Sequence, residues 1–136
     1  MRVVLDINVV LISLPVTSKY RPIFDALKTG KFELILSNAI LAEYHEKLAE
    51  KTSPLVADNV IKLLLSLENC TLQPIYFEWA LIHSDPDDNK YVDCALVANV
   101  DHLVSEDRHF SALRDIDFPR LSVIRIDEFL DWVRQG

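Results

Sequence analysis

Residues 84–95 read Ser-Asp-Pro-Asp-Asp-Asn-Lys-Tyr-Val-Asp-Cys-Ala, and the rest of the chain is best understood from this segment outward. It places four carboxylates in one loop and in the first turns of a predicted helix, which then continues as the apolar stretch 95–100. Asp93 lies well inside that helix, where a charge is costly unless it is paired or holds a metal ion. The earlier acids have simpler interpretations, Asp88 as a helix cap and Asp85-Pro86 as a turn.

The length and composition of the chain indicate one ordered domain. The chain has 136 residues, half of them apolar and only two of them glycine, so we expect a single domain over 1–136 with a substantial core. No window approaches the ~20 apolar residues of a membrane-spanning helix. The first residues are interrupted by Asp6 and Asn8 and predict a strand rather than a secretion signal.

Charge and cysteine content narrow the classes of function. The formal net charge of −7 argues against a broad basic face that coats nucleic acid, but it allows a site in which bound cations supply the positive charge. Cys70 and Cys94 are isolated thiols without metal-type spacing. They are typical of small core residues in a reducing compartment, so we expect a cytoplasmic protein.

Apolar runs and helical periodicities alternate along the chain. The strands are predicted at 2–5, 32–36, 72–77, 102–105 and 122–126, and Pro74 indicates that the third lies at an edge or ends there. Helices are predicted between and after them, with caps at Ser18, at Ser37 or Asn38, at Ser53 and at Asp127. A further helix begins near Phe110. This alternation predicts an α/β domain with a mostly parallel sheet of about five strands.

Four acids occupy comparable positions in this pattern. Asp6 follows the first strand, Asp107 follows the fourth, Glu43 lies about one turn into the helix after the second, and Asp93 lies in the helix before the fourth. Ligands of open parallel sheets bind at the carboxyl ends of strands, so we expect one pocket lined by all four. Carboxylates that crowd together need cations to stay ionised, and an all-oxygen site favours Mg²⁺ or Mn²⁺ over zinc.

Each acid also has an ordinary structural interpretation when it is taken alone. Asp6 fits a cap or turn, Glu43 fits a solvated helix face, and Asp107 fits a helix cap. Tyr20, Tyr44 and Tyr91 are aromatic side chains able to stack on bases, with core packing the alternative for Tyr44. The order and structural positions of the four acids together are the stronger signal.

Three motifs resemble those of the PIN-domain nucleases. They are Leu5-Asp6-Ile7-Asn8-Val9, the segment from Asp85 to Ala95, and Leu103-Val104-Ser105-Glu106-Asp107, with Glu43 between the first two. The resemblance covers essentially the whole chain and is strongest to the toxins of prokaryotic type II toxin–antitoxin pairs. It implies a three-layer α/β/α sandwich around a central sheet.

The resemblance also implies a site. Asp6, Glu43, Asp93 and Asp107 match the family's acidic quartet, which would hold one or two Mg²⁺ or Mn²⁺ ions. The resemblance assigns supporting positions to Asn8, Asp88 and Ser105. Ile7 departs from the family pattern, since many members carry Thr or Ser there.

The implied activity is endoribonucleolytic cleavage of RNA phosphodiester bonds by metal-activated water, in the toxin of a toxin–antitoxin pair. The implied partners are RNA, a cognate antitoxin and a second copy of the chain in a homodimer. The basic side chains expected nearest the RNA are Lys19, Arg21, Lys90 and Arg108. The alternative is a weak or inactive PIN-fold module that acts by binding RNA or an antitoxin. A dehalogenase-type phosphatase and a receiver domain fit less well, because Asn8 stands where the phosphatase needs a second acid and no late lysine completes either pattern.

Overall fold

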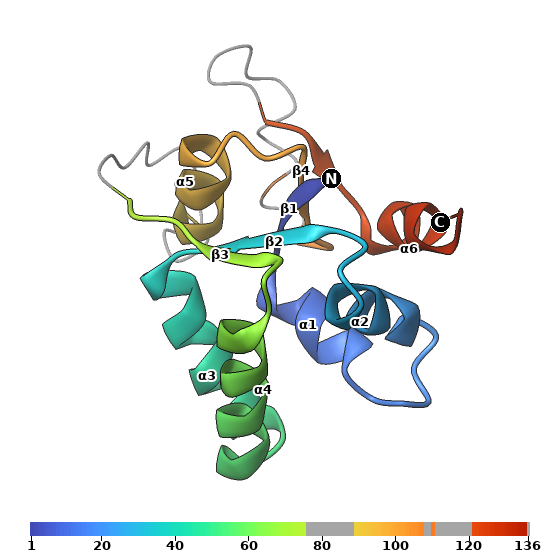
Figure 1. Cartoon of the computed structure of the whole chain (residues 1–136), viewed down its shortest axis with the longest axis vertical. Helices are drawn as coiled ribbons and strands as arrows, with labels where there is room; N and C mark the ends of the chain where they lie inside the picture. Colours follow the sequence, from blue (N-terminus) through green and yellow to red (C-terminus); the bar gives the residue numbers. More distant parts are fainter. Residues whose placement is uncertain (76–88, 108–109, 111–120, 136) are drawn as a thin grey trace.

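A parallel sheet forms the centre of the molecule (Figure 1). The computed structural model describes residues 1–75, 89–107, 110 and 121–135. The strands in this part of the chain are β1 (Arg2–Leu5), β2 (Glu33–Leu36), β3 (Cys70–Leu72), β4 (His102–Val104) and β5 (Val123–Ile124). Their order is β3-β2-β1-β4-β5, and every pairing between them is parallel. The predicted sheet is confirmed, and β1 has the predicted bounds.

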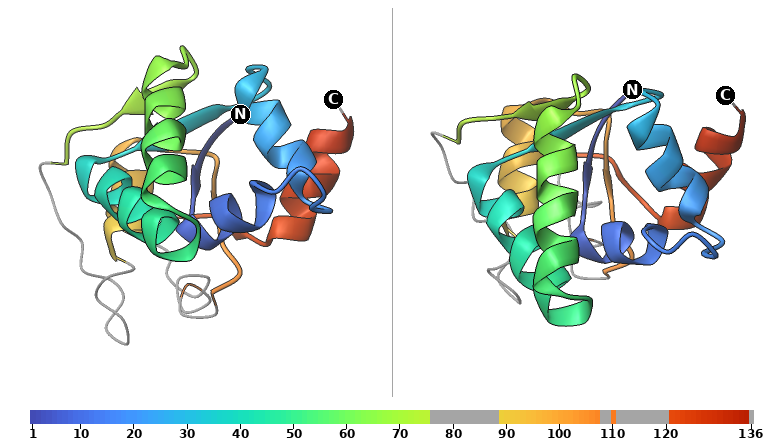
Figure 2. Two further views of the ribbon diagram at one scale, coloured as in Figure 1. Left: turned by 90° about the horizontal axis from the view of Figure 1, so that it is seen from below. Right: turned by 60° about the horizontal axis from the view of Figure 1, so that its bottom comes forward.

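Helices cover both faces of this sheet. They are α1 (Ile7–Ser13), α2 (Arg21–Lys28), α3 (Asn38–Lys51), α4 (Pro54–Ser66), α5 (Asn89–Val97) and α6 (Ile126–Gln135). Figure 2 shows α3, α4 and α5 on one side of the strands, with α2 and α6 on the other. The predicted three-layer α/β/α fold is therefore confirmed. None of the described helices is both long and apolar enough to span a membrane.

The helix caps follow the sequence prediction in part. Ser37 caps α3 by accepting a hydrogen bond from the N–H of Ile40, and Ser53 caps α4 in the same way. Ser18 was expected to cap α2, but its hydroxyl donates to the carbonyl of Ile12, and Tyr20 stands at the cap position without a side-chain bond. Pro22 in the first turn of α2 supplies a fixed φ there and needs no N–H partner.

Several boundaries differ from their predicted positions, and for two of them the structure shows the reason. The strand β3 begins at Cys70 rather than Leu72, because its partner β2 aligns Leu34 with Cys70 and Leu36 with Leu72. It lies at the edge of the sheet, as Pro74 had indicated. The last helix begins at Ile126, one residue before the predicted cap Asp127, because the Glu106 carboxylate accepts the N–H of Ile126 at 2.7 Å. The helix predicted to begin near Phe110 lies outside the described residues, except for the buried Phe110 itself.

The core holds the two central strands rigidly. Val3, Val4, Leu103 and Val104 are completely buried, and a fully buried side chain of this kind contributes about 1.5–3 kcal/mol. Tyr44 and Tyr91 are also buried, so the core-packing alternative for Tyr44 is confirmed and the prediction that the Tyr91 ring stacks on bases is wrong. The residues that directly follow β1 and β4 are therefore fixed in place by the packing of the strands themselves.

Candidate active site

The sheet order creates a switch point beside β1. The connection that follows β1 leads to β2 on one side of it, whereas β4 lies on the other side and its connection leads further away to β5. The connections after β1 and β4 therefore run in opposite directions across the sheet. In open α/β sheets the crevice at the carboxyl ends of such a strand pair is where ligands bind. Leu5 pairs with Val104, which brings the next residues, Asp6 and Ser105, side by side.

Asp6 and Ser105 form a buried polar pair at this point. The Ser105 hydroxyl donates to Oδ2 of Asp6 at 2.8 Å, and the N–H of Asn8 donates to Oδ1 at 3.3 Å. The two side chains are only 4% and 3% exposed. Asp6 is also the N-cap of α1, so its structural interpretation as a cap is correct and does not compete with the site. Asn8 contributes its backbone N–H to this pair.

The charge environment of Asp6 is unfavourable for a lone carboxylate. Burial raises its pKa above the ordinary value, and the negative charges of Asp107 and Glu43 raise it further, against the opposing bonds from Ser105 and Asn8. Asp107 is tied to the same pair, because its N–H donates to the Ser105 hydroxyl at 3.0 Å. Three of the four predicted acids therefore interact electrostatically at the switch point.

Glu43 projects from α3 and is held by two neighbouring residues of α5. Oε2 accepts a hydrogen bond from Nζ of Lys90 at 2.6 Å, and Oε1 accepts one from the hydroxyl of Tyr91. The side chain of Glu43 is 18% exposed. The interpretation of Glu43 as a solvated face residue is therefore wrong, because this carboxylate is partly buried and fully partnered.

Tyr91 is a site residue that sequence reasoning missed. Its hydroxyl accepts the N–H of Ile7 at 3.3 Å and donates to Glu43, so it joins the start of α1 to α3. Tyr44 lies nearby, and its hydroxyl donates to the carbonyl of Leu5. Burial raises the pKa of both phenols, so both remain protonated donors at neutral pH. Their positions in sequence, Tyr44 next to Glu43 and Tyr91 two residues before Asp93, were visible, but not the direction in which their side chains point.

Asp93 lies on the same edge of the sheet, in the wall of a cavity. It is 6% exposed and lines a cavity of about 230 Å³ together with Ser37, Gln73 and Lys90. Ser37 follows β2 and Gln73 follows β3, whereas Asp6 and Ser105 follow β1 and β4. Lys90 joins the two places, since it pairs with Glu43 and lines this cavity.

The donor chemistry at this edge fits an oxygen-seeking divalent ion. The four acids supply only carboxylate oxygens, which suit Mg²⁺ or Mn²⁺, and the repulsion felt by Asp6 is of the kind that a cation relieves. Within the described residues, however, no three acid, histidine or cysteine side chains are grouped closely enough to hold one ion. The acids are therefore near one another at a common edge, but they do not form a finished cage in this arrangement.

The predicted basic residues take different positions. Lys19 pairs with Asp127 at 3.7 Å, and Nε of Arg21 donates to Asp25 at 3.0 Å, with the Arg21 guanidinium also held by the carbonyl of Leu14. Lys90 is 21% exposed and pairs with Glu43. Arg108 and Asp88, predicted as an RNA contact and a supporting acid, lie outside the described residues.

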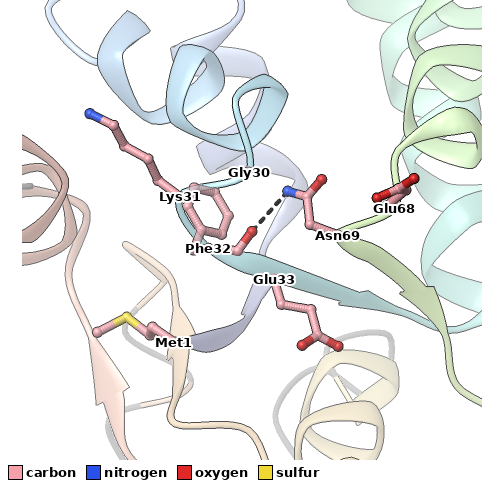
Figure 3. A pocket seen from close by; sticks show the side chains of 7 residues that line it. All are labelled: Met1, Gly30, Lys31, Phe32, Glu33, Glu68 and Asn69. Carbon is pink, nitrogen blue, oxygen red and sulfur yellow. Dashed lines mark hydrogen bonds between the residues drawn. The ribbon is translucent and has the colours of Figure 1, made fainter.

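A second cavity lies at the opposite end of the strands, where they begin. It measures about 570 Å³ and is lined by Met1, Gly30, Lys31, Phe32, Glu33, Glu68 and Asn69 (Figure 3). The side-chain amide of Asn69 crosses its wall and donates to the carbonyls of Leu27 and Phe32, both at 2.8 Å. Gly30 has a φ of +83° and ends α2 there, because the left-handed conformation suits glycine. This cavity is at the edge where strands begin, away from the acids.

Comparisons with known proteins place the chain in a family. A search of curated proteins found no match. Among solved structures, the chain is similar to the crystal structure of VapBC2 from Rickettsia felis bound to a DNA fragment from their promoter. That match has a TM-score of 0.62 at 14% identity and covers 92% of this chain and 98% of that one, which supports the fold. The family model of the PIN domain matches residues 2–109. Since this match spans well over half of the sequence, the chain belongs to the PIN-domain family, whose members are generally nucleases.

Proposed function

We propose that the protein is a metal-dependent endoribonuclease and the toxin of a toxin–antitoxin pair. The observation that carries this proposal is the buried Asp6–Ser105 pair at the switch point of a PIN-domain sheet. A carboxylate whose pKa is raised by burial, and further by two nearby acids, costs stability and is more typical of a functional site than of a purely structural one. Such groups gather at sites where a cation or a substrate resolves the repulsion.

Asp6, Glu43, Asp93 and Asp107 would hold one or two Mg²⁺ or Mn²⁺ ions. Such an ion supplies a nucleophilic water at neutral pH and stabilises charge on the transferring phosphate. The protein's own part is to hold the ligands. Ser105 fixes Oδ2 of Asp6, and Tyr91 fixes Oε1 of Glu43. The expected products carry a 5′ phosphate and a 3′ hydroxyl.

Lys19, Arg21, Lys90 and Arg108 are the proposed contacts to the RNA backbone. Lys19 and Arg21 lie where α2 begins, and α2 runs from there toward the start of β2, so both are on the same edge as Asp6. With a net charge of −7, the chain has few other means of attracting RNA, and the affinity should depend on bound divalent ions.

The proposed partners follow from the family and the fold. The similar structure is named as VapBC2 on promoter DNA, and its fold covers nearly the whole of this chain, which supports an antitoxin as partner. We further propose one domain over 1–136, a homodimer, and a cytoplasmic location consistent with the free thiols of Cys70 and Cys94.

A second candidate function has an observation in its favour. Both oxygens of Glu43 already have protein partners. A module that has lost catalysis and only binds RNA or an antitoxin would tolerate this arrangement. Under this alternative, the carboxylates at the switch point contribute nothing to RNA cleavage.

Cleavage of a mixed set of labelled RNAs in Mg²⁺, Mn²⁺ or EDTA distinguishes the two. The proposed nuclease cleaves only with metal and loses cleavage in Asp6→Asn and in Asp93→Asn. The matched control is Asp131→Asn, an exposed acid on α6, which should keep full activity. Metal-dependent cleavage that survives in both site variants would contradict the assignment, and a folded wild type inactive with every metal would favour the binding module.

A further inference from the structure

Lys90 forms a close, partly buried ion pair with one oxygen of Glu43. The ammonium nitrogen lies 2.6 Å from Oε2, and the two side chains are only 21% and 18% exposed. This is not a solvated surface pair, whose net contribution is typically near zero. The hydroxyl of Tyr91 takes the other oxygen, so Glu43 has no unused acceptor pointing toward α5.

A divalent ion on Glu43 would compete directly with this lysine. An ion bound to Oε2 would stand within a few ångströms of the ammonium, and like charges at such distances repel strongly in a partly buried site. Either the ion stays away or the ammonium leaves. The lysine side chain has four rotatable carbons and a compact charge, so it can move without any change in the helix.

We propose that Lys90 is an exchangeable counterion, which neutralises Glu43 in the metal-free protein and is displaced when a divalent ion binds. This rests on the proposed function, because it takes Glu43 to be a metal ligand. The lysine balances the charge of Glu43 and holds its carboxylate in place.

The displaced ammonium would stay at the edge of the sheet where the substrate is proposed to bind. Lys90 is the second residue of α5 and lines the 230 Å³ cavity beside Ser37, Asn38 and Gln73, at the edge of the sheet that carries Asp6. Once freed from Glu43, its charge is available to an RNA phosphate at that edge. The exchange would therefore couple arrival of the ion to the appearance of a positive charge for the substrate.

Calorimetric titration of the metal-free full chain with Mn²⁺ tests this without using activity. The variant Lys90→Met keeps the side-chain length and removes the competitor, so Mn²⁺ should bind at least about tenfold more tightly than to wild type. Lys90→Arg keeps the charge and should bind as wild type does. Lys47→Met is the control for net charge, since Lys47 pairs with Glu50 on the same helix as Glu43 and should leave Mn²⁺ affinity unchanged.

A double-variant cycle locates the effect. If Lys90 acts through Glu43, then the gain from Lys90→Met disappears in a Glu43→Gln background. The melting temperature gives a second reading: metal-free Lys90→Met should melt a few degrees below wild type, since it leaves Glu43 without its counterion, and saturating Mn²⁺ should remove that difference. Lys90→Gln repeats the test should the methionine variant fail to fold.

The outcomes separate this inference from the proposed function. Wild type that binds Mn²⁺ while Lys90→Met binds it equally or more weakly overturns the counterion role and leaves the metal site standing. Tightening by Lys47→Met equal to that by Lys90→Met also overturns it, since net charge would then be the cause. If no variant and no wild-type sample binds Mn²⁺ or Mg²⁺, the metal site itself is refuted.

Discussion

The two edges of the sheet carry similar residue types in opposite arrangements. At the edge where strands begin, Lys31, Glu33 and Glu68 line a cavity of about 570 Å³, and Glu33 pairs with Arg2 at 3.6 Å in a solvated contact (Figure 3). At the edge where strands end, Asp6 is buried beside other acids, and its pKa is raised. The first edge has exposed charges of both signs, whereas the second holds buried carboxylates, with Lys90 paired to only one of them.

This difference shows that cavity size alone does not identify a functional site. At the edge where strands begin, the Asn69 amide serves the fold, because it joins the end of α2 to the residue before β2. At the edge where strands end, the fold buries the Asp6 carboxylate beside other acids, and this lowers the stability of the folded state. Changes at the ending edge should therefore affect activity more than stability, and changes at the beginning edge should do the reverse.

The largest expected effect is that of Asp6→Asn. The amide keeps the cap and can keep a bond to Ser105, but it removes the charge from the proposed metal ligand, so we expect RNA cleavage to fall at least about 100-fold. The melting temperature of the metal-free protein should not fall, because the repulsion from Asp107 and Glu43 is relieved. Cleavage rates with Mg²⁺ test the loss of activity, and thermal melting tests the unchanged stability. A variant that is less stable but keeps its specific activity would contradict both expectations.

Tyr91→Phe and Tyr44→Phe are a matched pair within the ending edge. Both hydroxyls are buried, but Tyr91 holds a carboxylate of the proposed site and Tyr44 holds a backbone carbonyl. We expect Tyr91→Phe to lower cleavage about tenfold, as loss of a residue that orients a metal ligand does. We expect Tyr44→Phe to cost about 1–2 kcal/mol of unfolding free energy with little change in the rate. Urea unfolding and cleavage rates are measured for both variants. Equal cleavage rates in the two variants would show that Tyr91 has no special role in the active site.

Asn69→Ala tests the beginning edge. Loss of two hydrogen bonds to backbone carbonyls should lower the free energy of unfolding by about 2 kcal/mol. The cleavage rate per folded molecule should stay as it is in wild type. Denaturant unfolding gives the first quantity and active-site-normalised kinetics the second. A large loss of activity in the folded variant would mean that the cavity in Figure 3 takes part in the function.

The smallest effect is expected from Glu33→Gln. This carboxylate lies 3.6 Å from the Arg2 guanidinium, with both side chains more than a third exposed, so its pairing contributes roughly 0–1 kcal/mol. Activity should be unchanged. Thermal melts at low and at 0.5 M salt check this, and a salt-independent loss of several degrees would show that the pair is more strongly coupled than its exposure suggests.

Much of this fold could be predicted from local sequence patterns. The apolar run of β1, the cap of α3 at Ser37 and the cap and proline that begin α4 all act through neighbours in sequence. The pairing of Asp6 with Ser105 was also accessible, because parallel strand ends meet at one edge. These features depend on hydrophobic periodicity, on capping residues next to a helix and on the order of strands, all of which can be read from the sequence.

The remaining features depend on tertiary contacts that no local pattern encodes. The bounds of β3 are set by the register with β2, and the start of α6 is set by Glu106, which is 20 residues away from Ile126. Which residues of α5 face Glu43 depends on the rotation of that helix against the sheet. For this reason Lys90 and Tyr91 were not recognised as partners of Glu43.

The most direct test of the central claim is to locate a bound ion on the folded protein. Mn²⁺ added to isotope-labelled metal-free protein broadens the NMR signals of nearby residues. We predict that the amides of Asp6, Ser105 and Asp107 broaden first, while those of Lys31, Glu33 and Asn69 stay sharp, and that Asp6→Asn greatly reduces the effect. Broadening that begins around Lys31 and Asn69, or that persists unchanged in Asp6→Asn, would contradict the assignment of the active site to the ending edge of the sheet.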